Sequence, residues 1–194
     1  MTRAATVLAN TLINHGVDRV FCVPGESYLA LIDALYDTPS IDVVTARHEG
    51  GASFMAVADA KMTGKPGIVM VSRGPGATNA SIGIHVSQQD AVPVIMFVGQ
   101  VSREDRGREA FQEVDYVKTY SDMAKWVIEV SDADKISECV RRAFVIAQSG
   151  TPGPVIISLP EDMLLDETNA PALIPAKISQ PKPNMDDIIE ICDM

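Results

Sequence analysis

The sequence has 194 residues, enough for one good-sized domain that buries about 70 % of its unfolded surface. Hydrophobic residues make up 46 % of the chain and charged residues 22 %, the usual balance of a folded globular protein. This balance favours neither a disordered chain nor a membrane protein. The formal net charge of -10 argues against a nucleic-acid partner, which requires a basic face.

The N-terminus and the cysteines are typical of a cytoplasmic protein. The first residues lack the continuous apolar stretch of a signal peptide, and no run approaches the roughly 20 apolar residues that span a bilayer. The three cysteines, Cys22, Cys139 and Cys192, are odd in number and widely spaced. They suit reduced thiols and indicate neither a disulfide framework nor a zinc site.

Strand-like and helix-like segments alternate along the chain. Six apolar runs predict strands, over residues 19–23, 41–45, 67–72, 92–98, 126–130 and 154–159. Helical spacing predicts helices over residues 3–15, 28–37 with Ser27 as a cap, 52–60, the stretch up to about 89, and 132–149. Strands that are apolar along their whole length predict a three-layer α/β/α fold with a six-stranded parallel sheet and right-handed crossovers.

Two stretches fall outside this alternation. Residues 103–109 are charged without an apolar period and are expected to form a solvated, mobile loop, followed by a short helical or irregular segment over residues 110–120. After Pro160 the chain becomes rich in proline. We therefore expect one domain over residues 1–165 and a linker over residues 166–184.

Residues 185–194 begin an apolar helical pattern that stops at the C-terminus. This pattern predicts the start of a further domain, so that the chain is the front part of a longer protein. A tail helix that docks back on the domain is the alternative.

Four of the predicted strands lead into turns that contain glycine, at the same edge of the sheet. The turns are Pro24-Gly25, Glu49-Gly50-Gly51, Gly74 to Asn79, and Gly99-Gln100. In open α/β sheets, ligands bind in the crevice outside the carboxyl ends of the strands, and glycine lets them approach the backbone. The sequence therefore predicts a ligand site at this edge.

Glu49 is the first candidate for chemistry, because it puts a carboxylate at the corner between a buried strand and a helix. The segment alone also allows a simpler interpretation, in which Glu49 only faces the positive end of the helix dipole.

The glycine-rich loop after the third strand does not fit a nucleotide site well. Asn79 stands where a dinucleotide loop has its third glycine, and Pro75 stiffens the turn. No lysine-serine or lysine-threonine pair follows, which argues against a P-loop hydrolase. The second strand is followed by Thr45-Ala46-Arg47 rather than by a ribose-binding acid, which argues against a Rossmann domain.

The motifs together resemble those of a known family. They are Arg47 to Ala52, Gly74 to Asn79, Val98 to Val101, Ala110 to Asp115, Pro152 to Val155, and Leu159 to Asp162. In order and spacing, from about residue 3 to residue 165, the chain resembles the N-terminal pyrimidine-binding domain of thiamine diphosphate enzymes of the acetolactate synthase group.

The resemblance implies a catalytic role for Glu49. In this family the matching glutamate hydrogen-bonds N1' of the cofactor's aminopyrimidine and promotes its imino tautomer. This role needs a carboxyl group that can share a proton near neutral pH, and the apolar neighbours Ala52, Phe54, Met55 and Ala56 suit such a group.

The resemblance also implies the residues around the pyrimidine ring, namely Pro24, Gly25, Pro75, Gly76 and Asn79. For Pro24 and Gly25 an ordinary role as turn residues remains the alternative.

Phe111 and Gln112 match positions that reach toward the reactive end of the cofactor and the substrate, so Gln112 is the second candidate catalytic residue. A plain surface glutamine is the alternative. His48 and His85 stay outside the catalytic set, because a lone histidine is more often structural.

In this family a separate C-terminal domain binds the diphosphate and its Mg²⁺, and its Gly-Asp-Gly signature does not occur in this sequence. The site forms between this domain of one subunit and the diphosphate domain of another. The resemblance therefore implies a full-length homodimer or homotetramer, and a chain that is inactive alone.

The implied activity is the decarboxylation of a 2-oxo acid, such as pyruvate, and the transfer of the two-carbon unit to an acceptor. The acceptor stays open, because Val23 precedes Pro24-Gly25 where many synthases carry an aromatic residue. The alternatives are a simple 2-oxo acid decarboxylase and a non-catalytic module for subunit association or ligand sensing.

Overall fold

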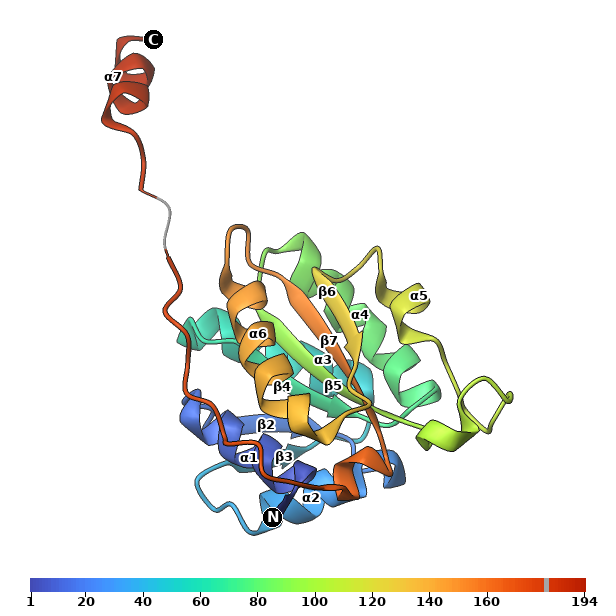
Figure 1. The fold of residues 1–194 in the computed structure, drawn as a ribbon. Coiled ribbons are helices and arrows are strands. Elements are labelled where there is room, and N and C mark those ends of the chain that lie inside the picture. The colour runs from blue at the N-terminus through green and yellow to red at the C-terminus, as the bar shows by residue number, and fades with distance from the viewer. Residues whose placement is uncertain (180–181) are drawn as a thin grey trace.

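The computed structural model describes residues 1–179 and 182–194 and confirms the three-layer α/β/α fold (Figure 1). Its central sheet has six parallel strands in the order β3-β2-β4-β5-β7-β6. The strands are β2 (Arg19–Cys22), β3 (Asp42–Thr45), β4 (Gly67–Val71), β5 (Val94–Gln100), β6 (Trp126–Glu129) and β7 (Pro154–Pro160). All six predicted strands are therefore confirmed, apart from small shifts at their ends.

Helices cover both faces of this sheet (Figure 1). The first face carries α1 (Ala4–Asn14), α2 (Leu29–Tyr36) and α6 (Ile136–Gln148). The second face carries α3 (Glu49–Thr63), α4 (Pro75–Gln89) and α5 (Tyr116–Tyr120). Single 3₁₀ turns form at η1 (Glu26–Tyr28), η2 (Arg103–Asp105), η3 (Ala133–Lys135) and η4 (Met163–Leu165).

The hydrophobic core lies in two layers, one on each side of the sheet. Along β4, for example, Ile68 packs into the first layer and Val69 into the second. Successive side chains of a strand point to opposite faces, so a strand that is covered on both sides must be apolar throughout. This is why the strands could be predicted from unbroken apolar runs.

The sheet contains a topological switch between its neighbouring strands β2 and β4. The chain leaves β2 toward α2 on the first face, and leaves β4 toward α4 on the second face. The two connections therefore diverge at the carboxyl ends of the strands. Such a divergence opens a crevice at the sheet edge, and this is where ligands bind in folds of this kind.

Helices α3 and α4 pack closely because Gly83 has no side chain. A Cβ atom on Gly83 would lie 2.3 Å from Oγ of Ser53 and 2.8 Å from its carbonyl carbon. Ala52, Ala56 and Ala80 are fully buried in the same layer. Small residues thus allow α3 and α4 to pack closely. This packing also brings the N-termini of the two helices together.

The sequence did not predict a second, two-stranded sheet. Strand β1 (Thr2–Arg3) pairs antiparallel with β8 (Glu167–Thr168). Further along, Asn14 Nδ2 donates to the carbonyl of Ala172 at 3.0 Å, and Ser137 Oγ donates to the carbonyl of Pro171 at 2.6 Å. The chain therefore stays attached to the domain beyond residue 165.

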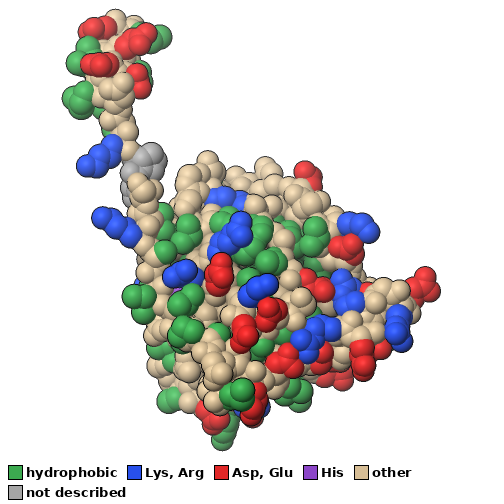
Figure 2. All heavy atoms as spheres, in the orientation of Figure 1, with side chains coloured by type: hydrophobic (Ala, Val, Ile, Leu, Met, Phe, Trp, Pro, Cys, Tyr) green, Lys and Arg blue, Asp and Glu red, His purple; other side chains and the backbone are tan. Residues whose placement is uncertain are grey.

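The last helix, α7 (Met185–Asp193), lies apart from the sheet at the end of an extended segment (Figure 1). Its acidic and apolar side chains face solvent (Figure 2), and Ile191 is 71 % exposed. Residues 180–181 of the predicted linker lie outside the described residues. The division into a domain, a linker and the start of a further domain stays a prediction.

No helix in the described part of the chain is long and apolar enough to cross a membrane.

Replacing Gly83 by alanine tests the close packing of α3 and α4. We expect Gly83→Ala to lower the free energy of unfolding by about 1–3 kcal/mol, because the added methyl group overlaps Ser53. The matched control is Gly51→Ala in α3, where a Cβ atom would meet nothing within 4 Å. This control should raise stability by about 0.5–1 kcal/mol, since alanine favours a helix over glycine. Urea denaturation measures both, and equal effects would contradict the packing.

Candidate functional site

The loops after β2, β4 and β5 lie against one another at the carboxyl edge of the sheet. A Cβ atom on Gly25 would lie 1.6 Å from Oγ of Ser72, and one on Gly99 would lie 2.2 Å from Oγ of Ser27. Only glycine permits these approaches. The turns after β2 and β4 therefore meet at this edge as predicted, whereas Gly99 and Gln100 belong to strand β5 and not to a turn.

Ser27 has a different role from the predicted one. It does not cap α2 but lies buried within the turn η1, where its hydroxyl oxygen accepts a hydrogen bond from the Arg73 backbone N–H at 3.1 Å. The prediction of a cap was wrong because the chain inserts a 3₁₀ turn before α2, which moves the helix start beyond Ser27.

Glu49 is the first residue of α3, so the helix begins three residues before the predicted start at Ala52. The cause is His48, whose ring Nδ1 accepts a hydrogen bond from the Gly50 backbone N–H at 3.0 Å and so caps the helix. This cap puts Glu49 in the first turn, where the dipole of α3 favours a negative charge.

The carboxylate of Glu49 is half-buried and lies between the starts of α3 and α4. Its Oε2 accepts a hydrogen bond from Asn79 Nδ2 at 2.9 Å. A Cβ atom on Gly76 would lie 3.3 Å from Oε1, so the glycine leaves room beside this oxygen. The structure thus brings together Glu49, Gly76 and Asn79, three of the residues that the sequence singled out.

Gly74 and Pro75 form the turn from β4 into α4, whose first turns carry Gly76 and Asn79. Gly74 has a φ of +61°, which favours glycine, and Pro75 is the first residue of α4, where its fixed φ suits a helix start. Pro75 is exposed, as is Pro24 on the neighbouring β2 loop, while Gly25 is half-buried against β4. The five residues predicted to surround a pyrimidine ring therefore lie at this edge, two on the loop after β2 and three in the first turns of α4.

Gln112 lies on the other side of the glycine-rich loop. A Cβ atom on Gly74 would lie 2.8 Å from Cβ of Gln112 and 3.0 Å from its carbonyl oxygen. Gln112 is half-buried and has a φ of +64°, whereas its neighbour Phe111 is 75 % exposed. The second predicted catalytic residue is thus in contact with Gly74, the residue that precedes α4.

Tyr116 joins these loops, a contact that no pattern in the sequence predicts. Its hydroxyl oxygen accepts a hydrogen bond from the Gly74 backbone N–H at 2.9 Å, and its hydroxyl group donates to the carbonyl of Gly99 at 3.5 Å. Burial raises the pKa of Tyr116 to about 12. A buried tyrosine at the start of a short helix has no recognisable pattern, so only the structure reveals this contact.

The charged loop over residues 103–109 is largely exposed to solvent, as predicted, and ion pairs tie it to the rest of the domain. Arg103 forms ion pairs with Asp162 at 2.7 Å and with Asp166 at 2.8 Å, and the hydrogen bonds with these carboxylates raise its pKa. Arg106 pairs with Glu113 and Glu129. Figure 2 shows basic and acidic side chains mixed over this part of the surface. The sequence did not predict these ion pairs, because contacts between distant residues leave no local period, and the mobility of the loop stays a prediction.

Within the described residues, no group of three or more histidine, cysteine, aspartate and glutamate side chains could hold a metal ion.

The fold and the site define a class of protein. A three-layer α/β/α domain carries a carboxylate at its topological switch, between two helix starts and next to glycines that leave space for a ligand. This is the arrangement of a domain that binds an organic cofactor through its loops.

Comparison with known families agrees with this class. Residues 2–119 match the model of the family described as "Thiamine pyrophosphate enzyme, N-terminal TPP binding domain". The chain therefore belongs to this family, and the resemblance found in the sequence is confirmed.

Individual relatives are acetolactate synthases. The chain is 38 % identical over 179 residues to acetolactate synthase isozyme 3 large subunit of Escherichia coli strain K12, covering 92 % of this chain and 31 % of the relative. It is 36 % identical over 187 residues to acetolactate synthase of Bacillus subtilis strain 168, covering 96 % and 33 %. It is 39 % identical over 175 residues to the acetolactate synthase large subunit of Lactococcus lactis strain IL1403, covering 89 % and 30 %. The chain thus spans about a third of the length of these relatives.

The raised pKa of Tyr116 predicts a loss of stability in alkali. Below about pH 10 the phenol is protonated in both the folded and the unfolded chain, and its contribution is complete. Between about pH 10 and its folded pKa of about 12, only the unfolded chain loses the proton, so stability falls as the pH rises.

We therefore expect the free energy of unfolding to fall by up to about 1.4 kcal/mol per pH unit through Tyr116 within this range. In Tyr116→Phe the free energy of unfolding should fall less steeply with pH. At lower pH it should be about 1–3 kcal/mol below that of the wild type, because the Gly74 N–H loses its acceptor. Urea denaturation at a series of pH values measures the two slopes. Equal slopes in both proteins would show that Tyr116 does not titrate in this way.

Proposed function

We propose that the full-length protein decarboxylates a 2-oxo acid, such as pyruvate, with thiamine diphosphate and transfers the two-carbon unit to an acceptor. The observation that carries this proposal is the Glu49 carboxylate, which lies at the switch edge, hydrogen-bonded by Asn79 and next to Gly76. The names of the relatives, all acetolactate synthases, support the same reaction.

The residues at this edge fit the aminopyrimidine ring of the cofactor. Glu49 offers a half-buried carboxylate whose Oε1 has open space beside Gly76, where any larger residue would crowd it. Pro24, Gly25 and Pro75 would line the ring from the neighbouring loops. When bound, thiamine diphosphate supplies the thiazolium ring that accepts the electron pair released by decarboxylation.

Glu49 would hold the proton that its carboxyl group shares with N1' of the ring. Asn79 fixes the rotation of the carboxyl group by its hydrogen bond to Oε2, which leaves Oε1 for the cofactor. The proposed role requires the carboxyl group to give up this proton as well as to hold it. A general acid or base must exist in both forms near the working pH.

Gln112 and Phe111 would act on the substrate side of the site. Gln112 is next to Gly74, and its amide group can donate to a carboxylate or a carbonyl oxygen of a 2-oxo acid. The exposed ring of Phe111 would cover the bound substrate and limit the access of water.

The remaining parts of the active site would come from elsewhere in the full-length protein. We propose that a diphosphate domain of a second subunit holds the diphosphate and Mg²⁺, and that the enzyme is a cytoplasmic homodimer or homotetramer. The support is the short span of this chain, about a third of each relative, together with the resemblance of its motifs to the pyrimidine-binding half of such sites.

Glu49→Gln in the full-length protein tests the proposal. The amide keeps the size of the side chain but cannot exchange a proton, so we expect the turnover number to fall by about 10²–10⁴-fold. The assay follows CO₂ release and acetolactate formation from pyruvate with thiamine diphosphate and Mg²⁺.

Glu138→Gln is the matched control, because it makes the same chemical change on α6, which covers the opposite face of the sheet. It should leave the activity unchanged. A wild-type protein that releases CO₂ without forming acetolactate or another ligation product would point to a simple decarboxylase. If wild type and Glu49→Gln were equally inert with a panel of 2-oxo acids, a non-catalytic module would replace the proposal.

A further inference from the structure

The loop that carries Gln112 has an unusual backbone. Between Gly107 and Gln112 it contains three residues with positive φ, of which only Gly107 at +76° is a glycine. Glu109 has a φ of +57° and Gln112 a φ of +64°. Such conformations are strained in residues other than glycine, and they persist only where other contacts impose them. Contacts with other groups must therefore hold the loop in this conformation, because its own residues do not favour it.

Glu113 makes the contacts that hold it. Its Oε1 accepts a hydrogen bond from the Gly107 backbone N–H at 2.7 Å, and its Oε2 accepts one from the Ala110 backbone N–H at 3.3 Å. The same carboxylate forms an ion pair with the guanidinium group of Arg106. Only 12 % of the Glu113 side chain is exposed. One carboxylate thus holds the loop at Arg106, Gly107 and Ala110, which lie next to or among the residues with positive φ.

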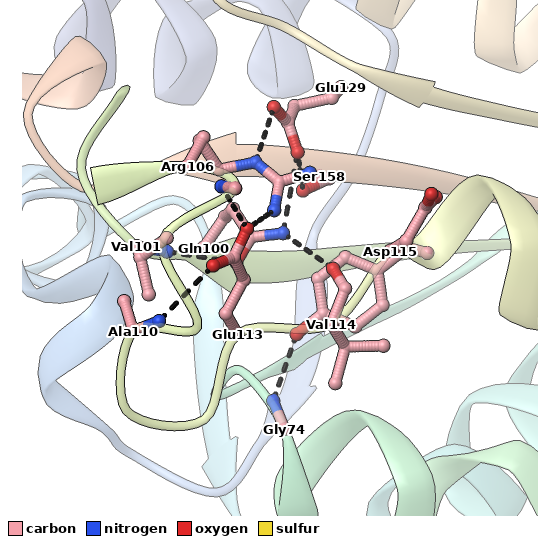
Figure 3. A network of polar contacts seen from close by, with 12 residues as sticks. Gly74, Gln100, Val101, Arg106, Ala110, Glu113, Val114, Asp115, Glu129 and Ser158 are labelled. Carbon is pink, nitrogen blue, oxygen red and sulfur yellow. Dashed lines mark hydrogen bonds and ion pairs between the residues drawn. The ribbon is translucent and has the colours of Figure 1, made fainter. Parts of the chain in front are cut away.

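Arg106 ties this closed loop to the central sheet (Figure 3). Its Nε donates to Oε1 of Glu129 on β6 at 3.0 Å. The other oxygen of Glu129 accepts hydrogen bonds from Gln100 at 3.3 Å and from Ser158 at 3.4 Å. Gln100 is fully buried and also donates to the carbonyl of Val114 at 2.8 Å. The network therefore runs from three strands of the sheet to both sides of Gln112.

We propose that Glu113 is a positioning residue that fixes Gln112 against the glycine-rich loop. The inference rests on the proposed function, in which Gln112 faces the substrate. Glu113 does not touch the residues around Glu49, so its effect should fall on the substrate rather than on the cofactor.

A neutral amide cannot replace the carboxylate of Glu113. Glutamine has a single acceptor oxygen, and its NH₂ group would point a donor at Arg106 or at a backbone N–H. At least one of the three contacts is therefore lost. The strained backbone then relaxes, and Gln112 moves away from Gly74. A displacement of about 1 Å in a substrate-positioning group costs up to about 10²-fold in rate.

The experiment compares Glu113→Gln with Glu109→Gln. Glu109 lies in the same loop, also at positive φ, but its side chain is exposed, so it is a matched control. In the full-length protein we expect Glu113→Gln to lower kcat/KM for pyruvate by about 10–100-fold while the Kd of thiamine diphosphate changes less than about twofold. Glu109→Gln should match the wild type. Glu113→Asp, which keeps the charge, should recover part of the loss.

Amide hydrogen exchange supplies a readout without activity. In this chain the amides of Gly107 and Ala110 should be protected in the wild type and in Glu109→Gln, and should exchange at least about tenfold faster in Glu113→Gln. Unchanged protection and unchanged kcat/KM in Glu113→Gln would overturn the inference. So would a proportional loss of melting temperature, cofactor binding and kcat/KM, which would indicate a general structural role.

The two proposals fail in different ways. A wild-type protein that is inert with every 2-oxo acid and binds no thiamine diphosphate contradicts the proposed function, whatever the loop does. A wild-type protein that is active, with Glu113→Gln equally active, contradicts only the positioning role.

Discussion

The close packing of α3 against α4 is the constraint on which the site depends. Gly83 allows the two helices to approach at Ser53, and this fixes the distance between their N-terminal ends. Glu49 and Asn79 lie about one helical turn before Ser53 and Gly83, so their hydrogen bond depends on the packing of the helices and not on either loop alone. The helices thus provide the rigid support that a carboxylate needs if its proton is to be shared with a ligand.

The site has two halves that are built by different means. The half around Glu49 rests on helix starts and buried small residues, whereas the half around Gln112 rests on a charged loop held by Glu113 and Arg106. Tyr116 connects them, because it binds the backbone of Gly74, the residue that lies between the two. The position of Glu49 therefore depends on packing in the core, and that of Gln112 on ion pairs and hydrogen bonds of the charged loop.

The sequence could predict those features that leave a local pattern. The six strands appear as apolar runs because both faces of the sheet are covered, and the glycines mark the turns at its carboxyl edge. The role of Glu49 could be inferred only from its motif, since an acid at a helix start is common. Three features left no such pattern: the early start of α3 after its cap His48, the pairing of β1 with β8, and the ion pairs of the charged loop. Each depends on groups that meet only after folding, or on strands too short for a period.

The pairing of β1 with β8 brings the two ends of the domain to one place. Thr2 lies opposite Thr168, so the first and the last strand of the folded unit lie side by side. A unit whose ends meet can be inserted into a loop of another protein, or circularly permuted, without disturbing its own core. In this respect the domain is a transferable module, and its neighbours along a longer chain can change while the sheet edge that carries Glu49 stays the same.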